Sequence, residues 1–122
     1  MAHIIVTGAN GYLGQRVVRL AEERGHLVTQ LGRKRVPQTE STRQFAWSLG
    51  EAVPEEAFSD FRGARPEAVI HLAHDWSNSG AVPGGLNIEG TARLSADCRA
   101  RGIERFVFVS SQSARAGALN LY

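Results

Sequence analysis

The chain has 122 residues, of which 43% are hydrophobic and 21% are charged, and these proportions are typical of one globular domain. No apolar run approaches the roughly 20 residues that a membrane span needs, the N-terminus lacks a secretory pattern, and Cys98 is the only cysteine, which indicates a reducing, cytoplasmic location. Fourteen Lys and Arg against twelve Asp and Glu give a formal charge of +2, which is too small to indicate a nucleic-acid partner.

The opening of the chain predicts a buried strand over residues 3–7 that enters a helix through Gly8, Gly11 and Gly14. This arrangement is typical of a pyrophosphate site, because a helix N-terminus offers free N–H groups and a partial positive charge. Gly8 lets the backbone leave the strand sharply, Gly11 leaves room for phosphate, and Gly14 lets the helix pack close to the sheet. An ordinary strand-to-helix connection is the alternative.

The first helix should bury Leu13, Val17, Leu20 and Ala21, which recur at helical spacing, and it should end at Gly25. Residues 26–31 then form a second strand. A strand, a helix and a strand within this length predict a right-handed crossover and therefore two parallel, neighbouring strands.

The residues after the second strand bear on the choice of cofactor. An acidic residue there would bind the ribose 2′-OH of NAD, but this chain has Gly32 followed by Arg33, Lys34 and Arg35. A guanidinium suits a 2′-phosphate, so the sequence favours NADP over NAD. A solvated basic turn is the alternative, and a nucleic-acid patch is disfavoured because the basic run is short and has no interleaved aromatic residues.

Further elements follow in chain order. Residues 43–47 predict a third strand, Pro54 begins a short helix that ends near Gly63, and the apolar run 68–73 predicts a fourth strand covered on both faces. His71 within this strand is predicted to be buried and hydrogen-bonded. No metal site is expected, because His71, His74 and Asp75 make a poor tetrahedral set.

The last predicted elements are a loop over 75–85, a helix over 87–101 that Gly102 ends, and a fifth strand over 105–109 covered on both faces. Serines at 110, 111 and 113 follow this strand. A serine-rich strand end is also a common turn or cap, so these residues alone leave a purely structural role open.

Three motifs resemble the extended and atypical short-chain dehydrogenase/reductases, which are epimerase/dehydratase-like: Thr7-Gly8-x-x-Gly11-x-x-Gly14, His71-Leu72-Ala73, and Asn87-x-x-Gly90-Thr91. The resemblance implies an α/β fold, a Rossmann-like doubly wound parallel sheet in the order 3-2-1-4-5 with helices on both faces. It implies one NAD(P)-binding domain over residues 1–122, with the sheet truncated after the fifth strand and the substrate domain absent.

The resemblance also implies a set of cofactor-binding residues. Leu49 packs on adenine beside Ser48, which stands where the family has an acidic residue. Arg33, from the basic run after the second strand, is added as the residue that meets the 2′-phosphate. The full cofactor-binding set is Gly8, Asn10, Gly11, Tyr12, Leu13, Gly14, Arg33, Ser48, Leu49, Leu72, Ala73 and His74.

The family's catalytic pattern places Ser111, or else Ser113, and Tyr122 at the substrate oxygen, with a lysine four residues beyond the tyrosine. Since the sequence stops at Tyr122, the resemblance implies a fragment of a reductase, epimerase or dehydratase that acts on a small molecule, and we expect no appreciable turnover from this chain alone. A truncated sheet would expose its last strand, which favours homodimers. The alternatives are a non-catalytic NAD(P) sensor and, less favoured by the glycine spacing, a site for S-adenosylmethionine.

Overall fold

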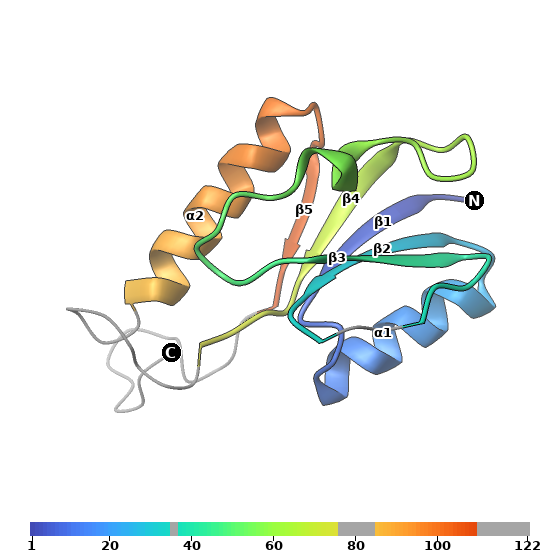
Figure 1. The fold of residues 1–122 in the computed structure, drawn as a ribbon, viewed down its shortest axis with the longest axis horizontal. Helices are drawn as coiled ribbons and strands as arrows, with labels where there is room; N and C mark the ends of the chain where they lie inside the picture. The colour runs from blue at the N-terminus through green and yellow to red at the C-terminus, as the bar shows by residue number, and fades with distance from the viewer. Residues whose placement is uncertain (35–36, 76–84, 110–122) are drawn as a thin grey trace.

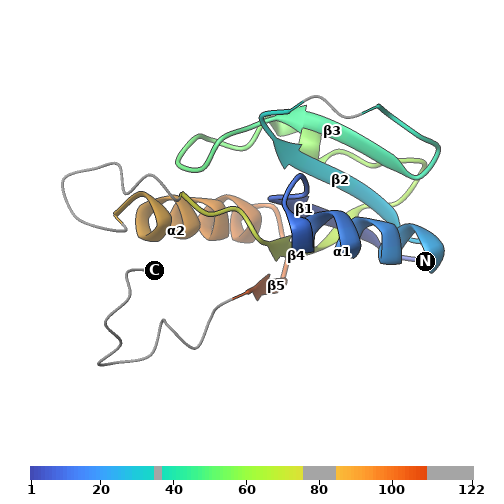
Figure 2. The same ribbon diagram turned by 90° about the horizontal axis from the view of Figure 1, so that it is seen from below.

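A computed structural model describes residues 1–34, 37–75 and 85–109. Five parallel strands form one sheet in the order β3-β2-β1-β4-β5, which Figure 2 shows from top to bottom. The elements are β1 (His3–Thr7), α1 (Tyr12–Glu23), β2 (Leu27–Gly32), β3 (Thr42–Ala46), the 3₁₀ helix η1 (Glu55–Phe58), β4 (Pro66–His71), α2 (Gly85–Ala100) and β5 (Arg105–Phe108). This order and the crossover helices confirm the predicted Rossmann-like topology.

Helices cover opposite faces of the sheet because neighbouring strand residues point in opposite directions. Val6 packs with Val18 of α1 in one cluster, whereas Ile5 packs with Leu94 of α2 in the other. Figure 1 shows α1 and α2 on opposite sides of the strands. Among the described residues, no helix is long and apolar enough to cross a membrane.

The buried face of α1 differs from the prediction. Gly14, Val18 and Ala21 are buried, whereas Leu13 and Leu20 are 47% and 48% exposed. Gly14 lies directly against the backbone of the preceding turn, and this close approach turns the face that contains Gly14 toward the sheet. Helical periodicity alone did not reveal this rotation, because apolar residues occur on more than one side of the helix.

The short helix after Pro54 was predicted to reach Gly63, but η1 ends at Phe58. The next residues form a tight turn in which the backbone groups of Phe61 and Ala64 exchange two hydrogen bonds of 3.0 Å. Gly63 has a φ of +82°, which a continuing helix does not allow. Turn geometry therefore ends the helix earlier than its apolar residues suggested.

β5 was predicted to be covered on both faces, and this is wrong. Val107 and Phe108 are 51% and 55% exposed. β5 is the edge strand of the described sheet, and α1 contacts β1 and β2 on the far side of β4. Since these two neighbouring side chains point to opposite faces, β5 is partly exposed on both faces of the described sheet.

Candidate dinucleotide site

The turn between β1 and α1 depends on two glycines. Gly8 has a φ of +71°, and a Cβ there would lie 2.6 Å from the backbone nitrogen of Ala73. A Cβ on Gly14 would collide with the carbonyl oxygen of Gly8 and lie 2.7 Å from the Cα of Ala9. The turn therefore tolerates no side chain at either position, and it lies in contact with the segment that follows β4.

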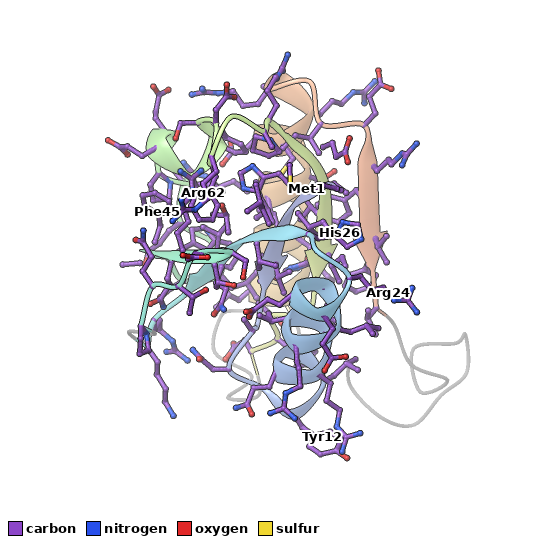
Figure 3. The ribbon with its side chains drawn as sticks, turned by 90° about the vertical axis from the view of Figure 1, so that its right-hand side faces the viewer. Met1, Tyr12, Arg24, His26, Phe45 and Arg62 are labelled. Carbon is purple, nitrogen blue, oxygen red and sulfur yellow. The ribbon has the colours of Figure 1, made fainter. Side chains whose placement is uncertain are left out.

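The N-terminus of α1 is open to an anion. Gly11 is the N-cap, no side chain of the described residues caps the helix there, and the first turn carries no acidic residue. Tyr12, the first helical residue, is 77% exposed, with the Arg16 guanidinium 4.4 Å from its ring centroid. Its side chain projects away from the body of the protein (Figure 3). The N–H groups at this helix end are thus available to a phosphate.

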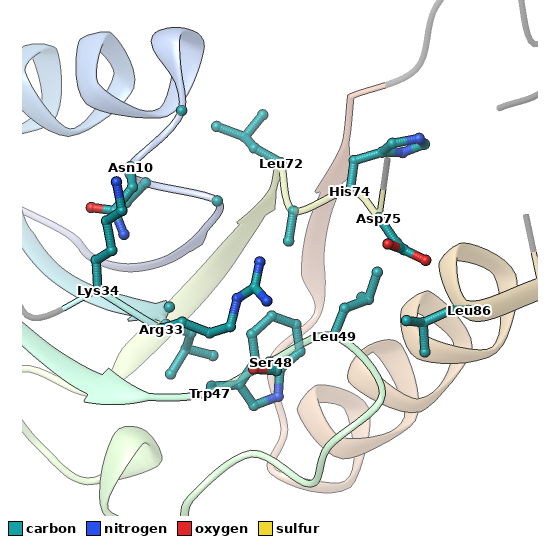
Figure 4. Close-up of a pocket in the computed structure, with 16 residues that line it drawn as sticks. Asn10, Arg33, Lys34, Trp47, Ser48, Leu49, Leu72, His74, Asp75 and Leu86 are labelled. Carbon is teal, nitrogen blue, oxygen red and sulfur yellow. The ribbon is translucent and has the colours of Figure 1, made fainter. Parts of the chain in front are cut away.

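A hollow of about 620 Å³ lies at the carboxyl edge of the sheet, where ligands bind in folds of this topology. Figure 4 shows Arg33 extending into it from the end of β2. Its described lining is Gly8, Ala9, Asn10, Gly11, Leu31, Gly32, Arg33, Lys34, Trp47, Ser48, Leu49, Leu72, Ala73, His74, Asp75 and Leu86.

A second hollow of about 900 Å³ adjoins the first and is more apolar. It shares Gly8, Gly11 and the segment 72–74 with the first hollow. Its described lining adds Tyr12, Leu13, Gly14, Asn87, Ile88, Thr91, Ala92, Ser95, Phe106, Phe108 and Val109. Every residue predicted to bind the cofactor therefore borders one of the two hollows.

The first hollow carries positive charge at the end of β2. Arg33 and Lys34 lie there, and the Gln44 side chain donates hydrogen bonds to the carbonyl oxygens of Gly32 and Lys34. Asp75 is the only carboxylate among the described lining residues, and it follows β4 on the opposite wall. Phosphate at the β2 end would therefore meet cations and no close carboxylate.

His71 is fully buried at the end of β4, as predicted. Its Nδ1 lies 2.6 Å from Thr7 Oγ1 and its Nε2 lies 2.8 Å from Thr91 Oγ1. Burial, and secondarily the nearby His74, lowers the pKa of the His71 imidazole from 6.5 to about 4. Within the part of the chain that the structure describes, no group of three or more His, Cys, Asp or Glu side chains is placed to hold a metal ion.

Asn87 holds the segment after β4 in place. Its Oδ1 accepts a hydrogen bond of 2.6 Å from the backbone N–H of Asp75, and its Nδ2 donates one of 3.1 Å to the Asp75 carbonyl oxygen. Sequence reasoning identified the motif that contains Asn87 and Thr91 but assigned neither side chain a contact. The sequence signal that could have indicated these contacts is the presence of polar residues on a helix face that is otherwise buried.

Several lining residues were absent from the predicted set, among them Trp47 and Leu86. Trp47 is buried beneath the loop that carries Ser48 and Leu49, and its Nε1 donates a hydrogen bond to the Glu51 carbonyl oxygen. The proposed catalytic residues Ser111 and Tyr122 lie outside the described residues.

The parallel sheet, the glycine turn and the open helix end define a Rossmann domain whose glycine turn borders two hollows. The chain matches the NAD dependent epimerase/dehydratase family over residues 4–120 and belongs to that family.

The chain is also similar to a curated reductase in sequence and to solved structures in fold. The chain is 32% identical over 124 residues to 2-alkyl-3-oxoalkanoate reductase of Stenotrophomonas maltophilia (strain K279a), a match that covers 90% of this chain and 33% of the reductase. MoeE5, solved in complex with UDP-glucuronic acid and NAD, is 29% identical with a TM-score of 0.75, covering 96% of this chain and 39% of MoeE5. A short-chain dehydrogenase/reductase superfamily protein from Agrobacterium tumefaciens, solved with bound NAD, is 31% identical with a TM-score of 0.66. The match covers 96% of this chain and 36% of that protein. The chain thus spans about a third of the length of the curated relative.

Proposed function

We propose that this chain is the dinucleotide-binding domain of a reductase, epimerase or dehydratase that acts on a small molecule, and that it prefers NADP to NAD. The observation that carries the proposal is the turn at Gly8 and Gly14, which admits no side chain and borders a hollow at the carboxyl edge of the sheet. In the whole protein, Ser111 and Tyr122 would act on the substrate oxygen.

The pyrophosphate would occupy the N-terminus of α1. A Cβ on Gly11 would meet only the Gly8 carbonyl oxygen, at 3.4 Å, so this position faces open space where a phosphate can approach the backbone. The helix dipole and the first N–H groups of α1 favour an anion there. MoeE5 and the Agrobacterium tumefaciens protein, each solved with NAD, share this fold at more than a quarter sequence identity, which supports a dinucleotide as the ligand.

The preference for NADP rests on the end of β2. Gly32 offers no carboxylate to the ribose 2′-OH, and a Cβ added there would meet Asn10 Nδ2 at 3.5 Å. Arg33 lines the same end of the hollow, where its planar guanidinium can bind a 2′-phosphate through two parallel hydrogen bonds.

Calorimetric titration of the chain with NADP, NAD and S-adenosylmethionine tests the proposal. We expect NADP to bind more tightly than NAD, and S-adenosylmethionine, which has no pyrophosphate, to bind more weakly than both. Tighter binding of S-adenosylmethionine, or no binding of either dinucleotide, would contradict the proposed function.

Substitution Arg33→Ala tests the cofactor preference. Because the substitution removes the guanidinium that would bind the 2′-phosphate, we expect NADP to bind about tenfold more weakly while NAD binding changes little. Arg24→Ala is the matched control, since Arg24 is exposed at the opposite end of α1. Equal losses for the two dinucleotides would show that Arg33 does not recognise the 2′-phosphate.

A further inference from the structure

Three buried or half-buried side chains form a continuous hydrogen-bonded chain beneath the two hollows. Thr7 ends β1, His71 ends β4, and Thr91 lies in α2. His71 bridges the two hydroxyl groups, with its Nδ1 on Thr7 and its Nε2 on Thr91, so this Thr7–His71–Thr91 chain joins three elements of the fold.

Counting donors and acceptors fixes the protonation of His71. Thr7 Oγ1 accepts the backbone N–H of Ala73 at 3.1 Å and that of Leu72 at 3.0 Å, and the Leu72 N–H is shared with the Thr7 carbonyl oxygen at 3.2 Å. A hydroxyl has two lone pairs and one proton, so the Thr7 proton is the group left to bond His71 Nδ1. His71 Nδ1 therefore accepts, and His71 Nε2 carries the proton and donates it to Thr91 Oγ1.

The same hydroxyl sets the position of a wall shared by both hollows. Leu72 and Ala73 line each hollow, and both are held by Thr7 Oγ1. Ala73 also lies so close to Gly8 that a Cβ on the glycine would be 2.6 Å from its nitrogen. The Thr7 hydroxyl, together with the Thr7 carbonyl oxygen that also accepts the Leu72 N–H, thus sets the spacing between the glycine turn and the segment after β4.

Protonation or rotation of His71 would break this arrangement. An imidazolium donates at both nitrogens, and the Thr7 hydroxyl has no lone pair left to accept from Nδ1. Phe106 and Phe108 pack beside the His71 ring, with centroids 6.0 and 5.8 Å away, which restricts the ring to its present place.

We propose that His71 is a positioning residue for the dinucleotide site: its neutral Nε2–H form, selected by Thr7 and anchored on Thr91, holds residues 72–73 at the spacing that the cofactor requires. This inference rests on the proposed function. It predicts that dinucleotide affinity depends on a hydroxyl group that does not itself contact the ligand.

Two substitutions and one matched control test the inference. Thr7→Val keeps the shape of the side chain but removes the hydroxyl, and we expect it to weaken NAD and NADP binding about tenfold each. Thr7→Ser restores the hydroxyl and should bind within about threefold of the wild type. Thr42→Val is the control, because Thr42 is also a buried strand threonine, but its hydroxyl has no hydrogen-bond partner in the described structure. The Thr42→Val chain should bind NAD and NADP with the affinity of the wild type.

Nitrogen NMR of the His71 ring tests the proposed tautomer directly, and rescue of affinity by Thr7→Ser links that tautomer to dinucleotide binding. In the ligand-free protein at neutral pH we expect Nε2 to be protonated and Nδ1 to be unprotonated and hydrogen-bonded. Thr7→Val should shift the Nδ1 signal and Thr7→Ser should return it. Thr91→Val, which removes the acceptor of the Nε2 proton, gives a second test of affinity if Thr7→Val does not fold.

Each outcome decides the inference. A proton on Nδ1, or unchanged dinucleotide affinity in folded Thr7→Val or Thr91→Val, would overturn it and leave the proposed function intact. A wild-type chain that binds neither dinucleotide would overturn the proposed function, and the affinity part of this inference with it, whatever the ring spectrum shows.

Discussion

The surroundings of His71 require a neutral imidazole. Its ring is fully buried, Nδ1 lies 2.6 Å from Thr7 Oγ1 and Nε2 lies 2.8 Å from Thr91 Oγ1. In the proposed tautomer, Thr7 donates to Nδ1 and Thr91 accepts from Nε2. Charging the ring would place an uncompensated cation in the protein interior and would set two donors against each other at Nδ1. Burial, and secondarily the nearby His74, lowers the pKa of the His71 imidazole to about 4.

This residue therefore makes stability depend on pH. The folded-state pKa of about 4 lies below the unfolded value of 6.5, so the unfolded chain binds the proton first as the pH falls. The stabilisation is complete above pH 6.5 and is lost between pH 6.5 and 4, amounting to about 3 kcal/mol. Burial lowers the pKa of His3 as well, which acts in the same direction.

Urea unfolding at a series of pH values measures this loss. His71→Asn keeps an acceptor near Thr7 but cannot be protonated in this range, so its free energy of unfolding should fall less steeply between pH 6.5 and 4. Identical pH dependence in the wild type and in His71→Asn would show that His71 is not the titrating group.

Some of these residue roles could be predicted and others could not. Gly8 and Gly14 were predictable, because a turn from a strand into a helix leaves a recognisable spacing of residues without side chains. The partners of Thr7 were not, because its hydrogen bonds cross 64 residues to His71 and depend on strand register. Sequence reasoning found that His71 is buried but gave no means of identifying Thr91 as its other partner.

At the scale of elements, Arg43 joins β3 to the turn before β4. Its Nε donates to Thr29 Oγ1 at 2.9 Å, and one terminal nitrogen donates to the Ser59 carbonyl oxygen at 2.7 Å. Its guanidinium also lies over the rings of Phe45 and Phe61, at 5.2 and 4.9 Å from their centroids. The packing of this irregular segment thus depends strongly on one side chain.

We expect Arg43→Ala to lower the free energy of unfolding by about 2 kcal/mol, because backbone carbonyls lose their donors and two rings lose a cation contact. Arg43→Lys should recover only part of this loss, since an ammonium lacks the planar fork of donors. Urea unfolding measures the change, and Arg93→Ala on the exposed face of α2 is the control. A loss no greater than that of the control would contradict the role given to Arg43.

Apolar runs and glycines in the sequence predicted the helices and strands. The errors concern which side chains are buried, because burial depends on tertiary contacts. The apolar runs gave β1, β2 and β4 to within a few residues, and glycines marked the ends of α1 and α2. The prediction of the buried face of α1 was wrong because the close approach of Gly14 to the preceding turn, and not the number of apolar residues, sets the rotation of the helix. The exposure of β5 depends on which elements reach the sheet edge, which no local pattern records.

On the scale of the whole molecule, the described strands are all parallel. Their carboxyl ends therefore lie along one side of the sheet, and the turns that lead into the strands lie along the opposite side. The first side carries Gly8, Gly11 and Gly14 beside the hollows. Gly25, Gly63 and Gly102 lie in the turns that precede β2, β4 and β5, on the opposite side. Of these six glycines, therefore, only Gly8, Gly11 and Gly14 border the proposed ligand.

The central claim is that a dinucleotide binds at the glycine turn between β1 and α1. The most direct measurement is the set of glycine amide signals of the nitrogen-labelled chain during titration with NADP. We expect the signals of Gly8, Gly11 and Gly14 to shift and saturate together, while those of Gly25, Gly63 and Gly102 stay in place. Shifts confined to the second set, or saturation by NADP with the first set unmoved, would contradict it.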